Sequence, residues 1–226
     1  MKQVIFGAGM AGLIAACKFP NALVFEAGKE RTEHQALLRF RSTAVSEATG
    51  IPFKKVKVTK EVIDSDNHTW HGTCPIKLQN QYSLKVSGGV MGRSIANLET
   101  VERYVAPDDF HQQLIERFRD RITFEAPVTL GDIQTFQEGG THMISTIPLP
   151  AMMKIIGDEL SLQKSAAAFK FSMSGIKVYT IELAAPESDV YQTIYFPSFG
   201  TNLYRASITG NKLIVEMIGK DNKYFI

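Results

Sequence analysis

A glycine-rich turn near the start of the chain constrains its fold more than any other feature. Gly7, Gly9 and Gly12 directly follow the short apolar run 2–6, and the apolar segment 13–19 comes after them. A second apolar run, 22–25, ends in Glu26. This order predicts a strand, a tight turn, a helix and a second parallel strand, which is the βαβ unit that binds dinucleotides.

Each glycine of this turn has a physical task in such a unit. Gly7 permits the sharp turn, Gly9 lets the backbone approach a pyrophosphate, and Gly12 lets the helix lie close to the sheet. The first helical residues, Met10 and Ala11, lie where a helix offers free N–H groups to phosphates.

The acidic residue at the end of the second strand indicates the kind of dinucleotide. Glu26 is placed to accept hydrogen bonds from both hydroxyls of an adenosine ribose, and Ala27 follows it. The negative charge of Glu26 would repel a 2′-phosphate, so FAD or NAD is favoured over NADP.

Composition disfavours several other classes of protein. The chain has 226 residues, 44% of them hydrophobic, enough for one large or two small cored domains. A net charge of +2 gives no bulk basic excess for nucleic-acid binding, and no apolar run is long enough to span a membrane. Cys17 and Cys74 lack the spacing of a disulfide scaffold or a zinc site, which favours a reducing compartment.

Basic side chains recur in two segments after the first βαβ unit. Arg39 and Arg41 would share one face of a strand. They could form a guanidinium pair that binds the cofactor pyrophosphate or an anionic substrate, or they could belong to a solvated strand edge. Residues 54–60 alternate basic and apolar side chains, which favours a solvated edge strand with lysines outward. The alternative is a phosphate-contacting patch that Arg39 and Arg41 join.

Aromatic and histidine residues gather in the loop 68–71. Trp70 could stack on a base or a flavin, whereas His68 and His71 without a third ligand make a poor metal site, so no metal is expected. Further along, the pattern predicts a strand at 81–86, a helix from 110 to 118, strands at 122–124, from 127 and at 141–147, and a short helix at 151–156. It also predicts a meander of antiparallel strands at 175–183, 190–196, 202–208 and 212–218.

The chain resembles the glutathione-reductase-like FAD flavoproteins, in the branch that holds amine oxidases and UDP-galactopyranose mutases. The resemblance rests on the glycine turn with Ala16 and Glu26, on the pattern 110–130, on the strand and turn 144–149, and on the segments 194–197 and 203–205. It implies an α/β fold, with a Rossmann-like FAD-binding βαβ domain (1–50 and 107–160) and an antiparallel sheet domain that covers the substrate (51–106 and 161–226).

The same resemblance extends the set of cofactor contacts. Val128 would hold the adenine through its backbone, and the turn of Thr146, Ile147 and Pro148 would face the bound nucleotide. Gln35 and Arg41 complete the expected FAD contacts. The family's glycine pair after the ribose-binding acid is replaced here by His34 and Gln35.

The end of the chain departs from the family pattern as well. A Gly-Asp segment that touches the flavin is expected in the family, whereas this chain ends at residue 226 soon after its last strand. The flavin site is therefore expected either to be open or to be completed by a second copy in a homo-oligomer.

Length and the segments 34–41 and 49–53 resemble small FAD-dependent oxidoreductases of bacteriophages that hypermodify thymidine. The resemblance implies oxidation of a glycine-modified thymidine in phage DNA, which releases glyoxylate and leaves 5-aminomethyl-deoxyuridine. The substrate would be modified DNA or a nucleotide in the host cytoplasm, with no membrane partner. Its carboxylate or phosphate would contact Arg39, Arg41 or Arg205, and its base would contact Trp70, Tyr195 or Tyr204.

Two other functions remain open at this point. A sugar-nucleotide mutase or a free amino-acid oxidase would keep the flavin and change the substrate. A non-catalytic protein that binds a nucleotide or a partner chain would need neither a flavin nor a substrate. The sequence assigns no residue as the catalytic base.

Overall fold

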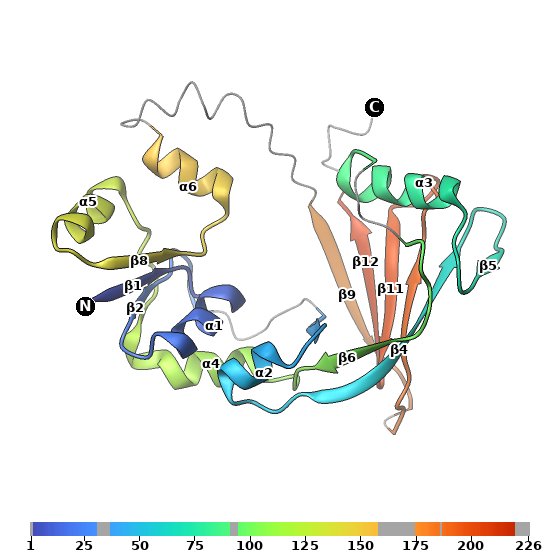
Figure 1. The fold of residues 1–226 in the computed structure, drawn as a ribbon, viewed down its shortest axis with the longest axis horizontal. Coiled ribbons are helices and arrows are strands. Elements are labelled where there is room, and N and C mark those ends of the chain that lie inside the picture. Colours follow the sequence, from blue (N-terminus) through green and yellow to red (C-terminus); the bar gives the residue numbers. More distant parts are fainter. Residues whose placement is uncertain (1, 31–36, 91–94, 158–174, 186, 220–226) are drawn as a thin grey trace. The chain divides into compact units, whose positions relative to one another are not determined.

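Two compact units make up the chain in the computed structural model, which describes residues 2–30, 37–90, 95–157, 175–185 and 187–219 (Figure 1). The first unit comprises Met1–His34, Ser42–Phe53 and Ala106–Phe171. The second comprises Gln35–Arg41, Lys54–Val105 and Ser172–Ile226. In the described part of the chain, no helix has the length and apolar character needed to cross a membrane.

A parallel sheet forms the centre of the first unit. Among the described residues its strand order is β7 (Ile122–Thr123), β2 (Leu23–Phe25), β1 (Gln3–Phe6) and β8 (His142–Ser145). Residues 4–6 of β1 are all buried, which explains the unbroken apolar run. With helix α1 (Met10–Lys18) between β1 and β2, the predicted βαβ unit is confirmed.

The helix predicted at 110–118 buries its apolar stripe. α4 (Phe110–Phe118) buries its apolar residues at helical spacing, and the 3₁₀ turn η1 (Arg119–Arg121) leads from it into β7. α2 (Ala44–Thr49) ends at Gly50, whose φ of +67° closes the helix. α6 (Leu149–Ile156) follows β8, as expected.

The strand expected from residue 127 is wrong. Thr129 and Asp132 form a capping box there, in which each side chain bonds the other residue's backbone N–H. Helix α5 (Leu130–Glu138) therefore begins at this point, and its Phe136 ring packs near the rings of Phe6 and Phe25.

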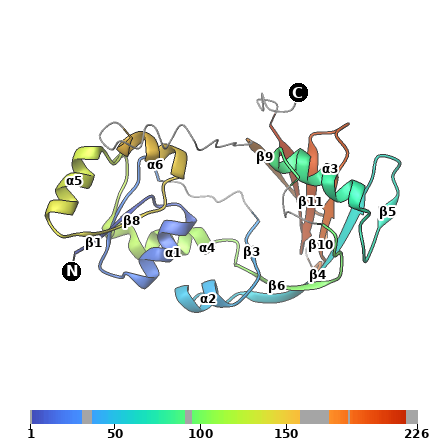
Figure 2. The same cartoon turned by 45° about the horizontal axis from the view of Figure 1, so that its top comes forward.

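A mixed sheet forms the second unit (Figure 2). Its strands, in spatial order, are β3 (Arg39–Phe40), β6 (Val101–Val105), β4 (Lys54–Ile63), β10 (Tyr191–Tyr195), β11 (Leu203–Thr209), β12 (Lys212–Ile218) and β9 (Ile176–Glu182). β10 lies parallel to β4, the other neighbours in this order are antiparallel, and the short β5 (Thr69–Trp70) pairs with the end of β4. The four strands expected after residue 174 are all present and pair antiparallel with one another, but the predicted meander is wrong, because β9 pairs with β12 and not with β10.

Two expectations for the second unit are wrong. β4 is not an edge strand, because β6 and β10 pair with it on its two sides. The segment 81–86 is not a strand, because it belongs to helix α3 (Ile76–Ser87). The residues of α3 that pack into the core, Leu78, Tyr82 and Val86, recur every four positions, which is helical spacing.

Candidate dinucleotide site and basic pocket

The turn between β1 and α1 is packed so closely that two of its positions accept only glycine. Gly7 has a φ of +101°, and a Cβ there would lie 2.7 Å from the Oγ1 of Thr146. A Cβ on Gly12 would lie 1.8 Å from the carbonyl oxygen of Gly7. The helix start is therefore held directly against the strand ends, as a dinucleotide-binding turn requires.

Gly9 differs from these two glycines because it faces open space. A Cβ at Gly9 would meet no atom of the described chain within 4 Å, and the residue has an ordinary extended backbone with φ −68° and ψ 176°. Gly9 caps the N-terminus of α1, where Met10 and Ala11 begin the helix. Open space beside the N-terminus of a helix can accept a phosphate group.

Glu26 is held rigidly at the carboxyl end of β2. Its carboxylate accepts hydrogen bonds from the N–H of Ala8 at 2.7 Å and of Gly28 at 2.9 Å. Its own N–H donates to the carbonyl of Thr123 at 2.9 Å. Because a carboxylate offers about four acceptor positions, Glu26 retains capacity for ribose hydroxyls.

The other predicted cofactor contacts lie at the same end of the parallel sheet, with two exceptions. Thr146 donates from its Oγ1 to the carbonyl of Phe6 at 2.9 Å, and Ile147 and Pro148 lead from it into α6. The segment before Val128 is tied to β2, because the N–H of Ala126 donates to the carbonyl of Glu26. Gln35 lies outside the described residues, and Arg41 belongs to the second unit.

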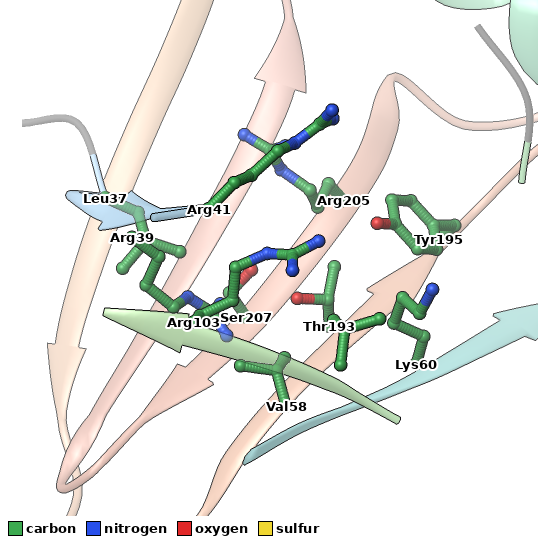
Figure 3. A pocket seen from close by; sticks show the side chains of 11 residues that line it. Leu37, Arg39, Arg41, Val58, Lys60, Arg103, Thr193, Tyr195, Arg205 and Ser207 are labelled. Carbon is green, nitrogen blue, oxygen red and sulfur yellow. The ribbon is translucent and has the colours of Figure 1, made fainter. Parts of the chain in front are cut away.

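Five basic side chains line one hollow of the second unit, called the basic pocket here (Figure 3). They are Arg39, Arg41, Lys60, Arg103 and Arg205. Thr193, Tyr195 and Ser207 add hydroxyl groups to the lining. The cavity volume is about 200 Å³.

The register of the sheet explains why these residues meet. Thr193 lies opposite both Lys60 and Ser207, and Tyr195 lies opposite Arg205. Residues directly opposite one another on paired strands have side chains on the same face. The basic pocket is therefore built from one face of adjacent strands, from β3 to β11.

One cation of the pocket has a buried carboxylate partner. Arg205 forms an ion pair with Glu216, which is 6% exposed and also accepts a hydrogen bond from the hydroxyl of Tyr204 at 3.1 Å. A bulge in β11 at this point lets both residues reach the same carboxylate. Although burial opposes the charge of Arg205, bonding to Glu216 raises its pKa.

The structure brings together only part of the predicted substrate set. Arg39, Arg41, Tyr195 and Arg205 line the basic pocket, whereas Trp70 and Tyr204 are not among its lining residues. Trp70 donates from its indole nitrogen to Asp64 at 3.0 Å, and Tyr204 belongs to a buried core cluster with Tyr82. These contacts explain the positions of both side chains, and their contact with a base stays a prediction.

Sequence reasoning missed the role of Arg103 and left Lys60 as one of several lysines. The alternation of side chains along β4 distinguishes Lys60 from Lys57. Val58 and Lys60 share the face that lines the pocket, while Lys57 points to the other face. Arg103 carries no local pattern that marks it. Only its pairing opposite Val56 brings it to the pocket.

Lys85 anchors the loop between two strands of the pocket. The residue is 3% exposed, and its ammonium donates to the carbonyls of Phe196, Ser198 and Leu203 at 2.9, 2.5 and 2.6 Å. Burial lowers the pKa of Lys85 to about 8. Since Tyr195 and Arg205 flank this loop, Lys85 positions two residues of the pocket.

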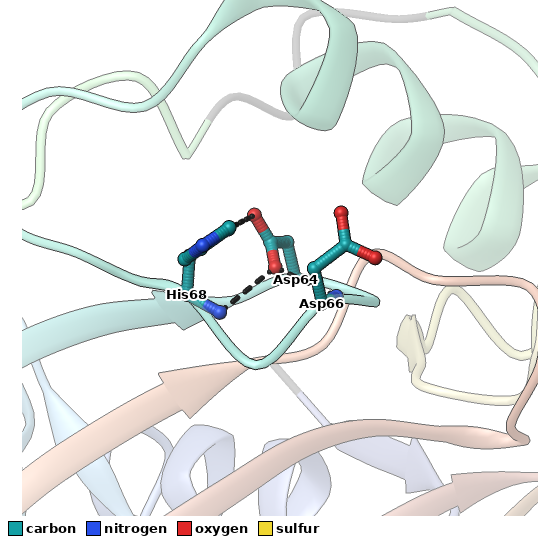
Figure 4. Close-up of side chains that lie close together, drawn as sticks. All are labelled: Asp64, Asp66 and His68. Atoms are coloured by element: carbon teal, nitrogen blue, oxygen red, sulfur yellow. Dashed lines mark hydrogen bonds and ion pairs between the residues drawn. The ribbon is translucent and has the colours of Figure 1, made fainter.

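A group of potential metal ligands in the described residues has a structural explanation (Figure 4). Asp64, Asp66 and His68 lie together in the turn after β4. Asp64 accepts hydrogen bonds from the backbone N–H groups of Asp66 and His68, both at 2.9 Å, and from Trp70. These hydrogen bonds stabilise the turn, and the turn brings the three side chains together.

Comparison by sequence finds no relative of the chain. No family model matches it, and no curated protein is similar enough in sequence to count as a match.

Comparison of folds finds solved structures that resemble nearly the whole chain. Reduced UDP-galactopyranose mutase has a TM-score of 0.61 at 13% identity, with 99% of this chain and 75% of that chain covered. A redesigned putrescine oxidase has a TM-score of 0.56 at 11% identity, with 97% and 76% covered. The PF1083 protein from Pyrococcus furiosus has a TM-score of 0.56 at 8% identity, with 96% and 80% covered. The chain has the Rossmann-type fold of flavoproteins of this kind, as its glycine turn predicts.

Proposed function

We propose that the chain is an FAD-dependent oxidoreductase. The observation that carries this proposal is the group formed by the turn Gly7–Gly12 and Glu26 at the carboxyl ends of β1 and β2, called the cradle here. It has open space at Gly9 and a fixed carboxylate at Glu26. The fold shared with UDP-galactopyranose mutase and putrescine oxidase supports FAD as the dinucleotide. FAD supplies an electron acceptor for hydride when it is bound.

The residues of the cradle fit this cofactor by charge and by space. The N-terminus of α1 favours the negative charge of a pyrophosphate, and the open side of Gly9 lets the phosphates approach the backbone. Glu26 would accept hydrogen bonds from the ribose hydroxyls, while the N–H groups of Ala8 and Gly28 hold its carboxylate in place. Thr146 keeps the two strand ends together through its bond to Phe6.

The substrate we propose is an amine, specifically a glycine-modified thymidine in phage DNA. The glycine α-carbon would lose hydride to the bound FAD and its nitrogen would lose a proton, which leaves an imine. Water would hydrolyse this imine to glyoxylate and 5-aminomethyl-deoxyuridine. Molecular oxygen would then take up the two electrons and two protons and leave as hydrogen peroxide. The likeness to putrescine oxidase supports amine oxidation, and the cations of the basic pocket support an anionic substrate.

A test of this function begins with the absorbance spectrum of the full chain after incubation with FAD. Anaerobic addition of DNA carrying the glycine adduct is expected to bleach the flavin bands, and glyoxylate is expected in the product. DNA with unmodified thymidine is the control. Bleaching by both DNAs, or by neither, contradicts the proposed substrate, and a chain that takes up no FAD contradicts the proposed cofactor.

A second candidate function is favoured by the likeness to UDP-galactopyranose mutase, whose coverage of this chain is 99%. A flavin-dependent mutase acting on a sugar nucleotide would isomerise its substrate without net oxidation. Incubation of the reduced flavoprotein with UDP-galactopyranose separates the two functions, because only the mutase would convert it.

A further inference from the structure

Within the described residues, the basic pocket has more positive charges than ion-pair partners. Within the described residues, Arg205 pairs with Glu216, and Arg39, Arg41, Lys60 and Arg103 form no ion pair. These four cations line a common hollow (Figure 3). Three of them lie on the adjacent strands β3, β6 and β4, and Arg41 lies just after β3. Like charges held this close repel one another, so an anion in the pocket stabilises the arrangement.

Two buried donors of the pocket also lack partners. Among the described atoms, the Nη1 of Arg39 and the Oγ of Ser207 are buried and make no hydrogen bond. Ser207 is 1% exposed, and the Nη2 of Arg39 makes only a long bond of 3.4 Å to the carbonyl of Gln192. A buried donor without an acceptor costs about 1–3 kcal/mol, so these groups point to a ligand that supplies acceptors.

The electrostatics agree with this geometry. Burial lowers the pKa of Arg39 to about 10, and the charges of Arg205 and Arg103 act in the same direction. Burial and the charge of Arg103 likewise lower the pKa of Lys60. With a pKa of about 10, Arg39 is still protonated at neutral pH and presents its positive charge to a ligand.

Charge and size together select the chemical class of the ligand. Four cations of the pocket have no ion-pair partner among the described residues. A carboxylate brings one negative charge to them, whereas a phosphomonoester, a diphosphate or two consecutive phosphodiesters of a strand bring two or more. A volume of about 200 Å³ is smaller than the roughly 300–1,000 Å³ of pockets that enclose whole drug-sized ligands. It suits one or two phosphate groups, with the rest of the molecule outside.

We propose that the basic pocket binds the phosphate groups of the substrate, through Arg39, Arg41, Lys60 and Arg103, with Ser207 donating a further hydrogen bond. The substrate is then a nucleotide or a nucleic-acid strand held by phosphate, and not a free amino acid held by carboxylate. This assignment deepens the proposed function and rests on it for the identity of the reacting group.

Calorimetric titration of the full chain, saturated with FAD where it binds, tests the pocket with inorganic pyrophosphate. Pyrophosphate is expected to bind, and its affinity is expected to fall as sodium chloride is added. Acetate at the same concentration is expected not to bind. Lys60→Gln and Arg103→Gln are each expected to weaken pyrophosphate binding about 10- to 100-fold, because each removes a charge-assisted hydrogen bond.

Lys57→Gln is the matched control. Lys57 lies on the same strand as Lys60 but on the opposite, exposed face, so its loss is expected to change the affinity less than twofold. Arg103→Lys retains the charge and is expected to recover part of the binding, which separates a lost contact from misfolding. Equal affinities of Lys60→Gln and Lys57→Gln, or acetate binding as tightly as pyrophosphate, would overturn the proposal.

Competition identifies the source of the phosphate. Displacement of pyrophosphate by thymidine diphosphate supports a free nucleotide, and displacement by a single-stranded oligothymidylate supports a DNA strand. Failure of both to displace it overturns the assignment as a substrate site. The outcome is separable from the proposed function, because a chain that takes up no FAD can still bind pyrophosphate, and a working flavoprotein can fail to do so.

Discussion

Replacement of Gly9 and of Gly12 by alanine is expected to have opposite consequences for stability. At Gly12 the new Cβ would lie 1.8 Å from the carbonyl oxygen of Gly7, so strand and helix must separate. Overpacking of this kind costs about 1–3 kcal/mol, and the misfit is severe enough to reach the upper end. At Gly9 no described atom lies within 4 Å of the new Cβ, and the backbone angles suit alanine.

The free energy of unfolding of Gly9→Ala is therefore expected to stay the same or to rise by about 0.4–1 kcal/mol, because alanine restricts the unfolded chain. The same methyl group projects into the space assigned to the pyrophosphate. We expect Gly9→Ala to lose FAD binding while it unfolds at the wild-type temperature or above.

Thermal unfolding without cofactor and titration with FAD measure the two effects separately. Gly9→Ala is expected to be a stable variant that does not bind FAD, and Gly12→Ala is expected to be destabilised. Wild-type FAD affinity in Gly9→Ala would refute the placement of the phosphates, and wild-type stability in Gly12→Ala would refute the close packing of the turn.

Three further changes probe single contacts. Glu216→Gln leaves the buried guanidinium of Arg205 without its carboxylate and is expected to lower the free energy of unfolding by about 3–5 kcal/mol, as measured by chemical denaturation. Glu26→Ala is expected to weaken FAD binding at least tenfold in a fluorescence titration, whereas Glu30→Ala, which removes an exposed ion pair, is expected to leave it unchanged. Burial lowers the pKa of Lys85 from 10.5 to about 8, so the folded chain releases this proton before the unfolded chain does. The stability of the wild type relative to Lys85→Met is therefore expected to rise between pH 8 and pH 10.5, and a constant difference across that window in denaturation series would contradict it.

Local sequence patterns predicted the elements whose structure depends on near neighbours. The glycine turn, α4 and the strand at 142–145 follow from spacing and burial within a few residues. The helix at 76–87 was missed because a window of six residues is too short to separate alternation from a four-residue repeat. The start of α5 follows from a local signal, the capping pair Thr129 and Asp132.

The basic pocket could be predicted only in part, for a different reason. Arg39 and Arg41 lie close in sequence, so their shared face could be anticipated. Lys60 and Arg103 join them through the pairing of β4 with β6 and β10, which is a contact between distant segments. No local pattern states which strands will be neighbours, and the same lack of information made β4 appear as an edge.

The division of the chain into interleaved segments affects how the protein is synthesised and dissected. Each unit is assembled from three separate stretches, so the backbone passes from one unit to the other five times. Ile5 of β1 pairs with Ile144 of β8, and the parallel sheet cannot close until the ribosome has produced both. Neither unit can therefore be expressed as one continuous fragment, and a protease cut at any crossing would leave both units with a broken chain.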